Sequence, residues 1–488
     1  MDTSSGKYRL KKANAQECAS FQPPCEAQDW IEQVRNLNME YTLQTGSVRK
    51  FRIDVFGCQM NERDAETLSG LLVNMGFEQV YGNDPAQLIL FVTCCVRENA
   101  EERIFGHIGA LSHECENNGS IIISCGCMMQ QPHIVEKIKK SYPNVKIVFG
   151  THNVHTFPEL LYRYMTKRKR VFSVWEKEGQ IVEDLPVQRT EKHKAWVNIV
   201  YGCNNFCSYC IVPHVRGRER SRKLEDILSE ITKLAEDGCR EITLLGQNVN
   251  SYGNDFGEKD LFSRLLYEIE KIDGIERVRF MTSHPKDLSD SLISAMKECS
   301  KVCEHVHLPF QAGSSRILKL MNRKYDKEHY LELVEKIKQA IPGVALTTDI
   351  IVGFPGETEE DFEETLDVVR RVGFDAAYMF IYSPRKGTPA AKLEQTTPSD
   401  VIGARFRRLL DLQTNIATEL ARQYEGKTVE VLVDGPSKSN PEMLSGRTRT
   451  GRLVNFKADE DLKGQLVDVE IIRAGAFWLE GKGVVRHG

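Results

Sequence analysis

The chain has 488 residues, and its 65 Lys and Arg against 69 Asp and Glu give a net charge of -4. Hydrophobic residues make up 41% and charged residues 27%, which excludes a mainly disordered, collagenous or coiled-coil chain. At this length roughly two to four domains are expected. No stretch reaches the roughly 18 uncharged apolar residues that span a bilayer, so we expect a soluble, cytoplasmic protein with no membrane partner.

The first part of the chain predicts an extension followed by an α/β domain. Residues 1–47 form the extension, with one short amphipathic helix near residues 30–41 that docks loosely on the body. Between residues 48 and 170, strand-like runs alternate with helical patterns. The strands are expected at 51–57, 88–93, 120–124 and 145–150, and the helices at 61–77, 98–114, 133–142 and 157–170. This alternation predicts a flavodoxin-like domain, whose parallel sheet is covered on both faces.

The rest of the chain predicts a linker and two further domains. Residues 171–190 have mixed polarity and suit a linker. Strands are expected at 196–202, 241–247, 277–283, 305–310, 345–353 and 376–383. Six such units over residues 191–426 indicate a partial, TIM-like β/α barrel, with an open sheet as the alternative. After a helix at 405–426, short strands at 428–435, 452–456, 464–472 and 475–484 predict a small all-β barrel over residues 427–488.

A run of three closely spaced cysteines is the sharpest chemical signal. Cys203, Cys207 and Cys210 follow the first strand of the middle domain in a C-x3-C-x2-C pattern. With His214 they would complete a Cys3His zinc site of plausible spacing. The run lies instead where the catalytic sites of β/α barrels collect. Three thiolates can also ligate three irons of a cubane cluster and leave the fourth iron open.

Three further cysteines each follow a predicted parallel strand of the first domain. Cys58, Cys94 and Cys127 should therefore meet at one edge of the sheet, where open α/β sheets bind ligands. Such a meeting suggests a second cluster with an open iron. Cys125 reads as a buried strand thiol. Cys95 adjoins Cys94, and physical reasoning alone does not exclude it as the ligand.

The C-x3-C-x2-C run resembles that of the radical S-adenosylmethionine (SAM) superfamily, in which the cluster binds SAM at its unique iron. The Gly-rich turn at residues 349–358, DIIVGFPGET, resembles the superfamily's SAM-side motif. The resemblance implies that Tyr209 packs against the adenine of SAM and that Glu357 belongs to the SAM site. Gln247 and Asn248 are further candidates for SAM contacts, or ordinary polar caps of a loop.

Five motifs and the C-terminal barrel together resemble the methylthiotransferase family of radical SAM enzymes. The motifs are residues 56–61 (FGCQMN), 93–100 (TCCVRENA), 126–130 (GCMMQ), 201–203 (YGC) and 383–388 (SPRKGT), and the barrel resembles a TRAM domain. The resemblance implies two 4Fe-4S clusters. Carried over by motif, the auxiliary cluster takes Cys58, Cys94 and Cys127, which settles Cys94 over Cys95. The SAM cluster takes Cys203, Cys207 and Cys210. Val92 and Gly451 differ from the residues that the family motifs usually have at these positions.

The residues Gln59, Met60 and Asn61 after Cys58 resemble the branch of the family that makes 2-methylthio-N6-isopentenyladenosine at position 37 of tRNA. This implies an enzyme that replaces the C2 hydrogen of adenine by a methylthio group. The alternatives are threonylcarbamoyladenosine or a ribosomal-protein aspartate as substrate, or an RNA-binding protein with two zinc sites. The resemblance also implies an electron donor such as flavodoxin or ferredoxin, and a sulfur donor.

The C-terminal barrel is expected to bind the tRNA anticodon stem-loop. Arg447, Arg449 and Arg452 offer cations for phosphates, and Trp478 offers a ring for stacking. The alternative is that the barrel's aromatic residues fill its core, which suits Phe456 better than Trp478. Two basic runs lie at residues 163–170 and 216–223, and their residues 168–170 and 216–222 are expected to extend the RNA track.

Overall fold

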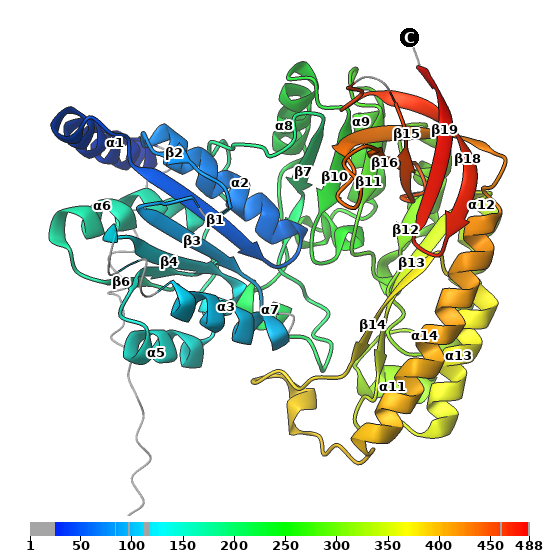
Figure 1. Cartoon of the computed structure of the whole chain (residues 1–488). Helices are drawn as coiled ribbons and strands as arrows, with labels where there is room; N and C mark the ends of the chain where they lie inside the picture. The colour runs from blue at the N-terminus through cyan, green and yellow to red at the C-terminus, as the bar shows by residue number, and fades with distance from the viewer. Residues whose placement is uncertain are drawn as a thin grey trace, which may run out of the picture.

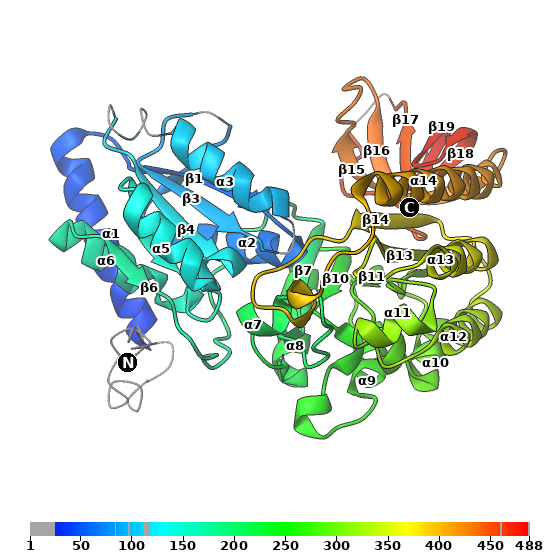
Figure 2. The same ribbon diagram turned by 90° about the horizontal axis from the view of Figure 1, so that it is seen from below.

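The computed structural model describes residues 25–82, 84–95, 98–111, 115, 118–458 and 461–486. Three units follow one another along the chain, coloured blue to cyan, green to yellow, and orange to red in Figure 1. In the view from below, the first unit lies on one side of the central unit and the last unit lies against another part of it (Figure 2). No helix among the described residues is long and apolar enough to cross a membrane.

The first unit is a six-stranded parallel sheet with the order β2-β1-β3-β4-β5-β6. Its strands are β1 (Lys50–Phe56), β2 (Glu78–Gln79), β3 (Leu88–Thr93), β4 (Ile121–Gly126), β5 (Val145–Phe149) and β6 (Val171–Ser173). The first five strands have the flavodoxin-like order that the sequence predicts. Residues 171–173, predicted as the start of the linker, instead form β6 at the edge of this sheet. The other predicted domain limits stay predictions.

Helices cover both faces of the first sheet, as a parallel sheet requires. They are α2 (Gln59–Asn74), α3 (Glu98–Ala110), α5 (Pro132–Ser141) and α6 (Phe157–Lys167), with short 3-10 turns η1 (Cys127–Gln130) and η2 (Val154–Thr156). Strands β3 and β4 are buried along their whole length. Their near-continuous apolar runs are typical of strands that are covered on both faces.

The N-terminal extension contains helix α1 (Cys25–Thr45), which packs beside α6. Val34 is fully buried, and Trp30 contacts the ring of Tyr162 with 5.2 Å between ring centroids. The buried Asn38 donates a hydrogen bond to the carbonyl of Met75 at 2.7 Å. The helix is therefore anchored by buried apolar and polar contacts, and the prediction of loose docking is wrong. The first 24 residues lie outside the described part of the chain.

The central unit carries the six predicted parallel strands. They are β7 (Lys194–Asn198), β10 (Glu241–Leu245), β11 (Arg277–Phe280), β12 (His305–His307), β13 (Ala345–Val352) and β14 (Ala376–Ile381). Two three-stranded segments, β7-β10-β11 and β12-β13-β14, meet at a parallel bridge between Val278 and Val302. The sheet therefore curves as a partial barrel. The loop between β7 and β10 adds a small hairpin of β8 (Val200–Tyr201) and β9 (Arg220–Ser221).

Helices of this unit, apart from the short α7, enclose the largest apolar cluster among the described residues. The helices of the unit are α7 (Val212–Val215), α8 (Leu224–Glu236), α9 (Leu261–Glu270), α10 (Asp290–Glu298), α11 (Ser315–Leu320), α12 (Lys327–Ala340), α13 (Glu359–Val372) and α14 (Ser399–Arg422), with 3-10 turns η3 (Val249–Ser251), η4 (Asn254–Phe256), η5 (Pro285–Asp287) and η6 (Pro389–Lys392). The long helix α14 runs beside α13 and leads to the last unit (Figures 1 and 2).

The last unit is a closed barrel with the strand order β15-β16-β17-β19-β18. Its strands are β15 (Thr428–Pro436), β16 (Leu444–Thr448), β17 (Leu453–Phe456), β18 (Leu466–Gly475) and β19 (Trp478–Arg486). The sequence analysis missed β16, because LSGRT lacks the apolar alternation that marks a strand. Closure supplies the hydrogen bonds that hold such a segment, since a barrel pairs every strand on both edges.

Side chains of the central unit cross both domain boundaries. Ile211, which directly precedes α7, and Val215, its last residue, are buried in the apolar cluster of the first unit that contains Cys127. At the other boundary, the buried Arg277 donates to the carbonyl of Arg447 at 2.8 Å and to Glu430 at 2.7 Å. The three units are therefore packed against one another through specific contacts.

Candidate functional site

Three cysteines of the first unit lie at the carboxyl ends of adjacent strands. The register pairs Phe56 with Thr93 across β1 and β3, and Thr93 with Gly126 across β3 and β4. Cys58, Cys94 and Cys127 follow these three strand ends directly or after one residue. The sheet therefore brings together three thiols that are up to 69 residues apart in the sequence (127 − 58 = 69), at the edge where ligands of such sheets bind.

Local contacts hold this group of thiols. Cys58 is the N-cap of α2, and the hydrogen bond with Cys94 lowers the pKa of the Cys58 thiol to about 6. The buried Cys127 accepts a hydrogen bond from Arg216 Nε at 3.1 Å. Gly126 has a φ of +97°, and a Cβ there would lie 2.5 Å from the carbonyl oxygen of Thr93. Only glycine therefore lets β4 turn sharply enough to present Cys127.

Cys95 and Cys125 have apolar surroundings. Cys125 is buried in the core behind β4, and burial raises the pKa of its thiol, in agreement with its reading as a strand thiol. Cys95 is buried in the other apolar cluster of the first unit. Its hydrogen bond with Cys127 raises the pKa of Cys95 and lowers the pKa of Cys127. Cys94, and not Cys95, is the neighbour of Cys58.

The second group of thiols lies in the loop between β8 and α7. Cys203 and Cys207 are buried and Cys210 is half-buried. Burial raises the pKa of Cys203 to about 11 and that of Cys210 to about 12. The buried Arg323 lies 3.5 Å from Cys207 Sγ and donates to it. The loop returns on itself, since the Cys203 amide donates to the carbonyl of Gly217 at 3.1 Å.

The chemistry of these donors fits iron-sulfur clusters. Among the described residues, no group of three or more His, Cys, Asp or Glu side chains is arranged to hold one metal ion. A zinc ion needs its four ligands around a single point, whereas the three cysteines of a cubane cluster bind three different irons. His214, the fourth ligand of the alternative zinc site, is exposed and lies edge-on to the ring of Phe206.

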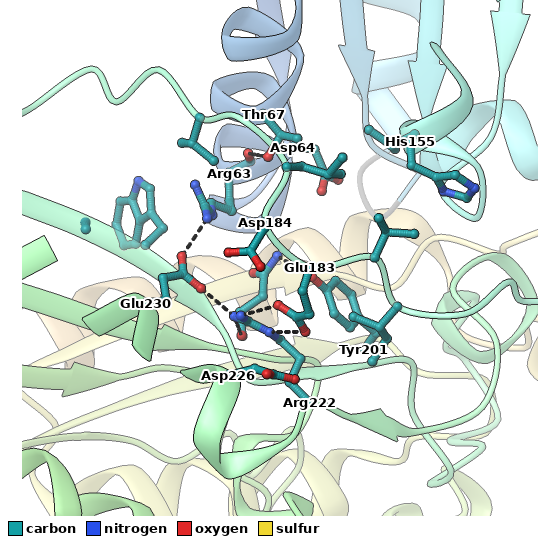
Figure 3. A pocket seen from close by; sticks show the side chains of 18 of the residues that line it. Arg63, Asp64, Thr67, His155, Glu183, Asp184, Tyr201, Arg222, Asp226 and Glu230 are labelled. Atoms are coloured by element: carbon teal, nitrogen blue, oxygen red, sulfur yellow. Dashed lines mark hydrogen bonds and ion pairs between the residues drawn. The ribbon is translucent and has the colours of Figure 1, made fainter. Parts of the chain in front are cut away.

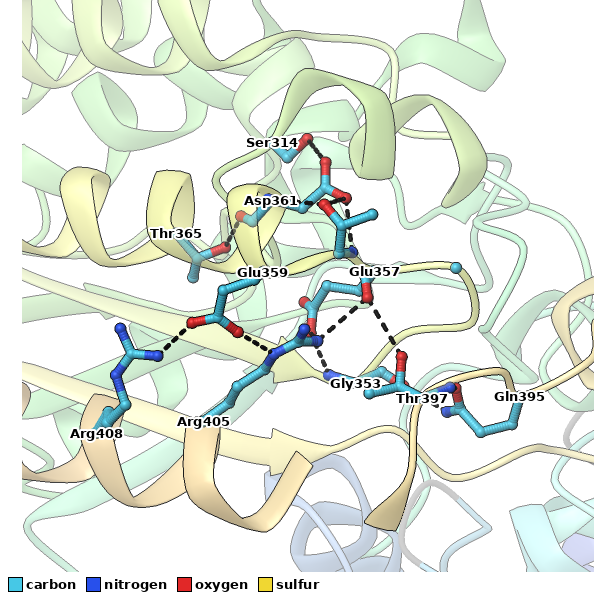
Figure 4. Close-up of polar contacts among 12 residues, drawn as sticks. Ser314, Gly353, Glu357, Glu359, Asp361, Thr365, Gln395, Thr397, Arg405 and Arg408 are labelled. Atoms are coloured by element: carbon cyan, nitrogen blue, oxygen red, sulfur yellow. Dashed lines mark hydrogen bonds and ion pairs between the residues drawn. The ribbon is translucent and has the colours of Figure 1, made fainter. Parts of the chain in front are cut away.

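The Gly-rich turn after β13 is held by an internal network, shown in Figure 4. The buried Glu357 accepts from the Gly353 amide at 2.8 Å and from Arg405 Nη1 at 3.2 Å. Burial raises the pKa of Glu357 to about 7. Its carboxylate is occupied by the turn and by α14. These bonds give Glu357 a role in holding the turn, and its contact with the cofactor stays a prediction.

Two of the other predicted SAM contacts are also bonded within the protein. Gln247 accepts from the Gly202 amide and contacts the sulfur of Met60 in the first unit. Asn248 is buried and donates to Asp287 at 2.7 Å, while its amide oxygen has no partner. Tyr209 is partly buried against the core of the barrel. Asn248 keeps a free amide oxygen for a ligand, and Gln247 holds the loop of Cys203.

Three polar residues near the carboxyl ends of the barrel strands were missed by the sequence analysis. Buried atoms of Asn250, Ser283 and Tyr382 have no hydrogen-bond partner among the described residues. A buried polar group without a partner is costly, so a bound polar ligand at this edge would be favoured. No motif marks these residues, and only their position after β10, β11 and β14 reveals them. They fit a cofactor with amino, carboxylate and hydroxyl groups.

The inner face of the barrel is open beside its last strand. Tyr378 and Phe380 pair in register with Asp349 and Ile351 of β13, so these side chains share one face of the sheet. The exposed fractions are 52% for Tyr378 and 40% for Phe380. Behind them, His307 lies 3.6 Å from the Asp349 carboxylate and edge-on to the ring of Tyr378. This face of the sheet therefore has the exposed rings of Tyr378 and Phe380 at its surface and the polar side chains of Asp349 and His307 beneath them.

A cavity of about 360 Å³ is lined by residues of the first unit, the linker and the β/α barrel. Arg222 lies in it between Glu183 of the linker and Glu230 of α8, with contacts of 2.5 and 2.6 Å (Figure 3). Arg63 of α2 reaches the same Glu230 at 2.6 Å. The charges are paired with one another, so this network joins the units and presents no unbalanced charge to a ligand.

The predicted RNA-contacting arginines differ in orientation. Arg449 donates to Glu304 and to the carbonyls of Ser300 and Val302, all at 2.8 Å. Arg452 is buried and donates to Asp375 at 2.6 Å. Both side chains attach the small barrel to the core, which contradicts the prediction of phosphate contacts for these two. Only Arg447 is exposed.

The aromatic residues of the small barrel separate as the alternative reading suggested. Phe456 is fully buried in the core of the barrel. The exposed fractions are 37% for Trp478 and 64% for Phe477, and the Arg473 guanidinium lies 5.1 Å from the Trp478 ring centroid. The outer face of the barrel therefore carries two exposed rings, and the arginine beside Trp478 is paired with Glu480.

The two basic runs are only partly exposed. Arg216 and Arg222 of the second run are buried in ion pairs within the protein. Arg170 of the first run donates to carbonyls at the end of α5, including that of Lys139 at 2.9 Å. These three arginines are engaged within the protein, and the RNA track stays a prediction for the exposed residues of the two runs. Arg163, Lys167, Arg168 and Lys169 of the first run and Arg218 of the second are exposed.

Family models match each unit. Residues 197–369 match the radical SAM superfamily, residues 50–150 match the group described as uncharacterized protein family UPF0004, and residues 422–484 match the TRAM domain. A radical SAM methyltransferase from Kitasatospora setae, TsrM, has a TM-score of 0.52 at 13% identity, covering 70% of this chain and 77% of that one. This likeness concerns the fold alone.

Curated relatives match almost the whole chain. The tRNA-2-methylthio-N(6)-dimethylallyladenosine synthases of Acetivibrio thermocellus and Alkaliphilus oremlandii are each 55% identical over 93% of this chain and 95% of their own length. That of Clostridium perfringens is 55% identical over 90% of this chain and 99% of its own length.

The barrel, the loop of three cysteines and the matching superfamily model define a radical SAM enzyme. The curated relatives are more than half identical to this chain over nine-tenths of its length, and they narrow the class of radical SAM enzymes to one family. The chain belongs to the tRNA-2-methylthio-N(6)-dimethylallyladenosine synthase family.

Proposed function

We propose that this protein adds a methylthio group to C2 of N6-isopentenyladenosine at position 37 of tRNA, using SAM and two 4Fe-4S clusters. One observation carries the proposal. In a chain of this family, the segment from Cys203 to Gly217 contains the second group of cysteines and also contacts Cys127 of the first group through Arg216. When bound, the clusters supply reductive cleavage of SAM and the sulfur that replaces the C2 hydrogen. That hydrogen is neither acidic nor open to substitution by side chains alone.

The proposed ligands divide between the two groups of thiols. Cys58, Cys94 and Cys127 hold the auxiliary cluster, and Cys203, Cys207 and Cys210 hold the SAM cluster. The contact between Cys58 and Cys94 supports this choice for the first group, since the thiol of Cys95 contacts Cys127 and not Cys58. The position of Cys58 at the N-terminus of α2 favours its thiolate form, as a metal ligand requires.

The chain's own residues shape the proposed SAM site. Glu357 holds the turn at Gly353 in place through the Gly353 amide. The free amide oxygen of Asn248 and the orphaned groups of Asn250 and Ser283 offer hydrogen bonds to the polar groups of SAM. Tyr209 offers a ring face to the adenine. These contacts orient SAM without changing its chemistry.

The proposed site for the modified adenosine is the inner face beside β14. Tyr378 and Phe380 would cover the purine and its isopentenyl group, which is apolar and gains by leaving water. Asp349, on the same face of the sheet, would accept a hydrogen bond from the N6–H of the base. An adenosine without the isopentenyl group would lose the apolar part of this contact.

For tRNA binding we propose the outer face of the small barrel. Arg447 contributes to phosphate binding, while Phe477 and Trp478 offer rings to unstacked bases. The reaction also requires an electron donor, such as a flavodoxin or ferredoxin, and a sulfur donor. We propose that the protein acts in the cytoplasm, where its tRNA substrate is found.

The proposal is tested with anaerobically reconstituted full-length protein, SAM, reductant, sulfide and isopentenylated tRNA. Nucleoside digestion and mass spectrometry should detect the 2-methylthio nucleoside. The protein should hold about eight irons, four for each cluster. Cys58→Ala and Cys94→Ala should lose about four irons and the product but keep SAM cleavage. Cys203→Ala should lose SAM cleavage as well.

Cys95→Ala is the matched control, since it removes the neighbouring thiol without removing a proposed ligand. It should keep both clusters and the product. If Cys95→Ala loses four irons while Cys94→Ala keeps them, the ligand assignment is wrong. If SAM is cleaved but isopentenylated tRNA gives no product, the proposed substrate is wrong and the radical chemistry stands.

A further inference from the structure

Arg216 belongs to the central unit, but its side chain lies inside the first unit. It follows α7 directly. Its side chain, 7% exposed, lies beside Val215, which is buried in the apolar cluster that contains Cys127. The stretch from Cys210 to Arg216 therefore carries a cation across the domain boundary. A guanidinium stays charged in such an environment.

Two hydrogen bonds fix the position of this cation. Arg216 Nε donates to Cys127 Sγ at 3.1 Å, and Nη2 donates to Asp64 Oδ2 at 3.0 Å. Asp64 belongs to α2, whose N-cap is Cys58. The guanidinium is thus bonded to one proposed ligand of the auxiliary cluster and to the helix that begins at another.

The next residue contacts the other cysteine group. The carbonyl of Gly217 accepts from the amide of Cys203 at 3.1 Å. Two consecutive residues, 216 and 217, therefore touch a proposed ligand of each cluster. The contact with Cys203 and the contact with Cys127 are therefore made by neighbouring residues of one chain segment.

The charge has a direct electrostatic consequence for whatever Cys127 binds. Reduction adds a negative charge to a cluster, and a nearby cation stabilises that charge, more so where water is excluded. Hydrogen bonds to sulfur and local charge are among the factors that set the potential of a cluster. Asp64 offsets part of this effect, because its carboxylate faces the same guanidinium.

We infer that Arg216 is a positioning residue that raises the reduction potential of the auxiliary cluster through Cys127 and links that cluster to the loop of the SAM cluster. The inference rests on the proposed function, since it requires Cys127 to be a cluster ligand. It predicts that the auxiliary cluster responds to a residue of the radical SAM domain. A purely structural arginine would not show this response.

The test is a potentiometric titration of the full-length two-cluster enzyme, followed by electron paramagnetic resonance. Addition of SAM identifies the signal of the SAM cluster, since only that cluster binds it. At the wild-type midpoint of the auxiliary cluster, Arg216→Met should lower the ratio of reduced to oxidised cluster about tenfold, which equals about 59 mV for one electron. Arg216→Lys should keep most of the wild-type ratio, and the SAM cluster should not change.

Two further variants keep the test decisive. Arg218→Met removes an equal charge from an exposed position in the same loop and should leave both potentials unchanged. Asp64→Asn removes the carboxylate that offsets the cation, and should shift the auxiliary potential in the opposite direction. This second variant tests the inference even if Arg216→Met fails to fold.

The outcomes separate this inference from the function on which it rests. An unchanged auxiliary potential in Arg216→Met with full iron content overturns the inference alone. An equal shift of both clusters also overturns it, because that result reflects general loosening of the protein. A wild-type protein with only about four irons overturns both the ligand assignment and the inference.

Discussion

At the residue scale, burial decides how single ionisable groups respond to pH. His305 starts β12 and faces the small barrel, and its Nε2 lies 3.2 Å from Thr347 Oγ1. Burial lowers the pKa of His305 to about 3, with Arg279, His307 and Arg447 adding to the effect. The neutral imidazole is therefore the form that the folded protein accepts.

We expect His305 to make the protein less stable in acid. The unfolded chain takes up a proton near pH 6.5 and the folded chain only near pH 3, so stability falls as the pH drops through this window. Between pH 7 and pH 5 the loss from this group should be about 2 kcal/mol. His305→Gln should lose that part of the pH dependence in thermal unfolding. The exposed His329→Gln should keep it, and equal slopes for wild type and His305→Gln would contradict the assignment.

The surface residues of the small barrel should set tRNA affinity. Arg447→Ala should lower the slope of log K against log salt by about one, because one phosphate contact is lost. Trp478→Ala should weaken binding by about 1–3 kcal/mol with little change in the slope, since stacking carries no charge. Fluorescence anisotropy with labelled tRNA measures both. Lys336→Ala, an exposed change on α12, is the control, and a matching fall in its slope would argue against a local interface.

At the element scale, the turn between β13 and α13 shows why a motif needs its surroundings. Gly353 has a φ of +75°, and a Cβ there would lie 2.8 Å from Ile402 of α14. The turn is thus fitted between its own strand and a helix about 50 residues further along. Gly373, which ends α13, has a φ of +65° but open space around it.

These two glycines form a matched pair for a test of the turn. Gly373→Ala should cost about 1–2 kcal/mol from backbone strain alone. Gly353→Ala should cost more, because strain and overlap with Ile402 add, and should weaken SAM binding by more than tenfold. Thermal unfolding and equilibrium dialysis with SAM measure the two effects. Equal losses of stability and SAM affinity in both variants would show that the contact with Ile402 is unimportant.

At the scale of the whole molecule, buried ion pairs hold the small barrel against the core. Arg452 and Asp375 form one such pair at 2.6 Å, with 8% and 18% of their side chains exposed. Arg277 and Glu430 form another at 2.7 Å. Removing one member of a buried pair leaves an uncompensated charge, which costs more than the pair itself contributes.

Arg452→Met should therefore destabilise the protein by about 3 kcal/mol. The double variant Arg452→Met/Asp375→Asn should recover at least half of this loss, because no charge is left buried. Arg473→Met breaks the exposed pair with Glu480 and should cost less than about 1 kcal/mol. Denaturant unfolding compares the three. A single variant as stable as Arg473→Met would show that water reaches the interface.

The sequence by itself determined the architecture and the two cysteine groups. Apolar runs alternating with helical periodicity predicted both parallel sheets, and the register of β1, β3 and β4 confirms that Cys58, Cys94 and Cys127 come to one edge. Such features are local, because strand length, helix period and cysteine spacing are read along the chain. Strands β2, β6 and β16 escaped prediction, since such short segments without apolar alternation are strands only through their neighbours.

The tertiary structure alone decided which charged side chains face inward. Arg449, Arg452 and Arg216 read as surface cations in the sequence, yet each finds a carboxylate, carbonyl or thiol more than 70 residues away. The buried polar atoms of Asn250 and Ser283 that have no hydrogen-bond partner are likewise evident only in the tertiary structure. The sequence pattern of a basic run does not show which distant group each of its side chains will contact. The direction of each side chain follows from packing between units, which the linear sequence does not encode locally.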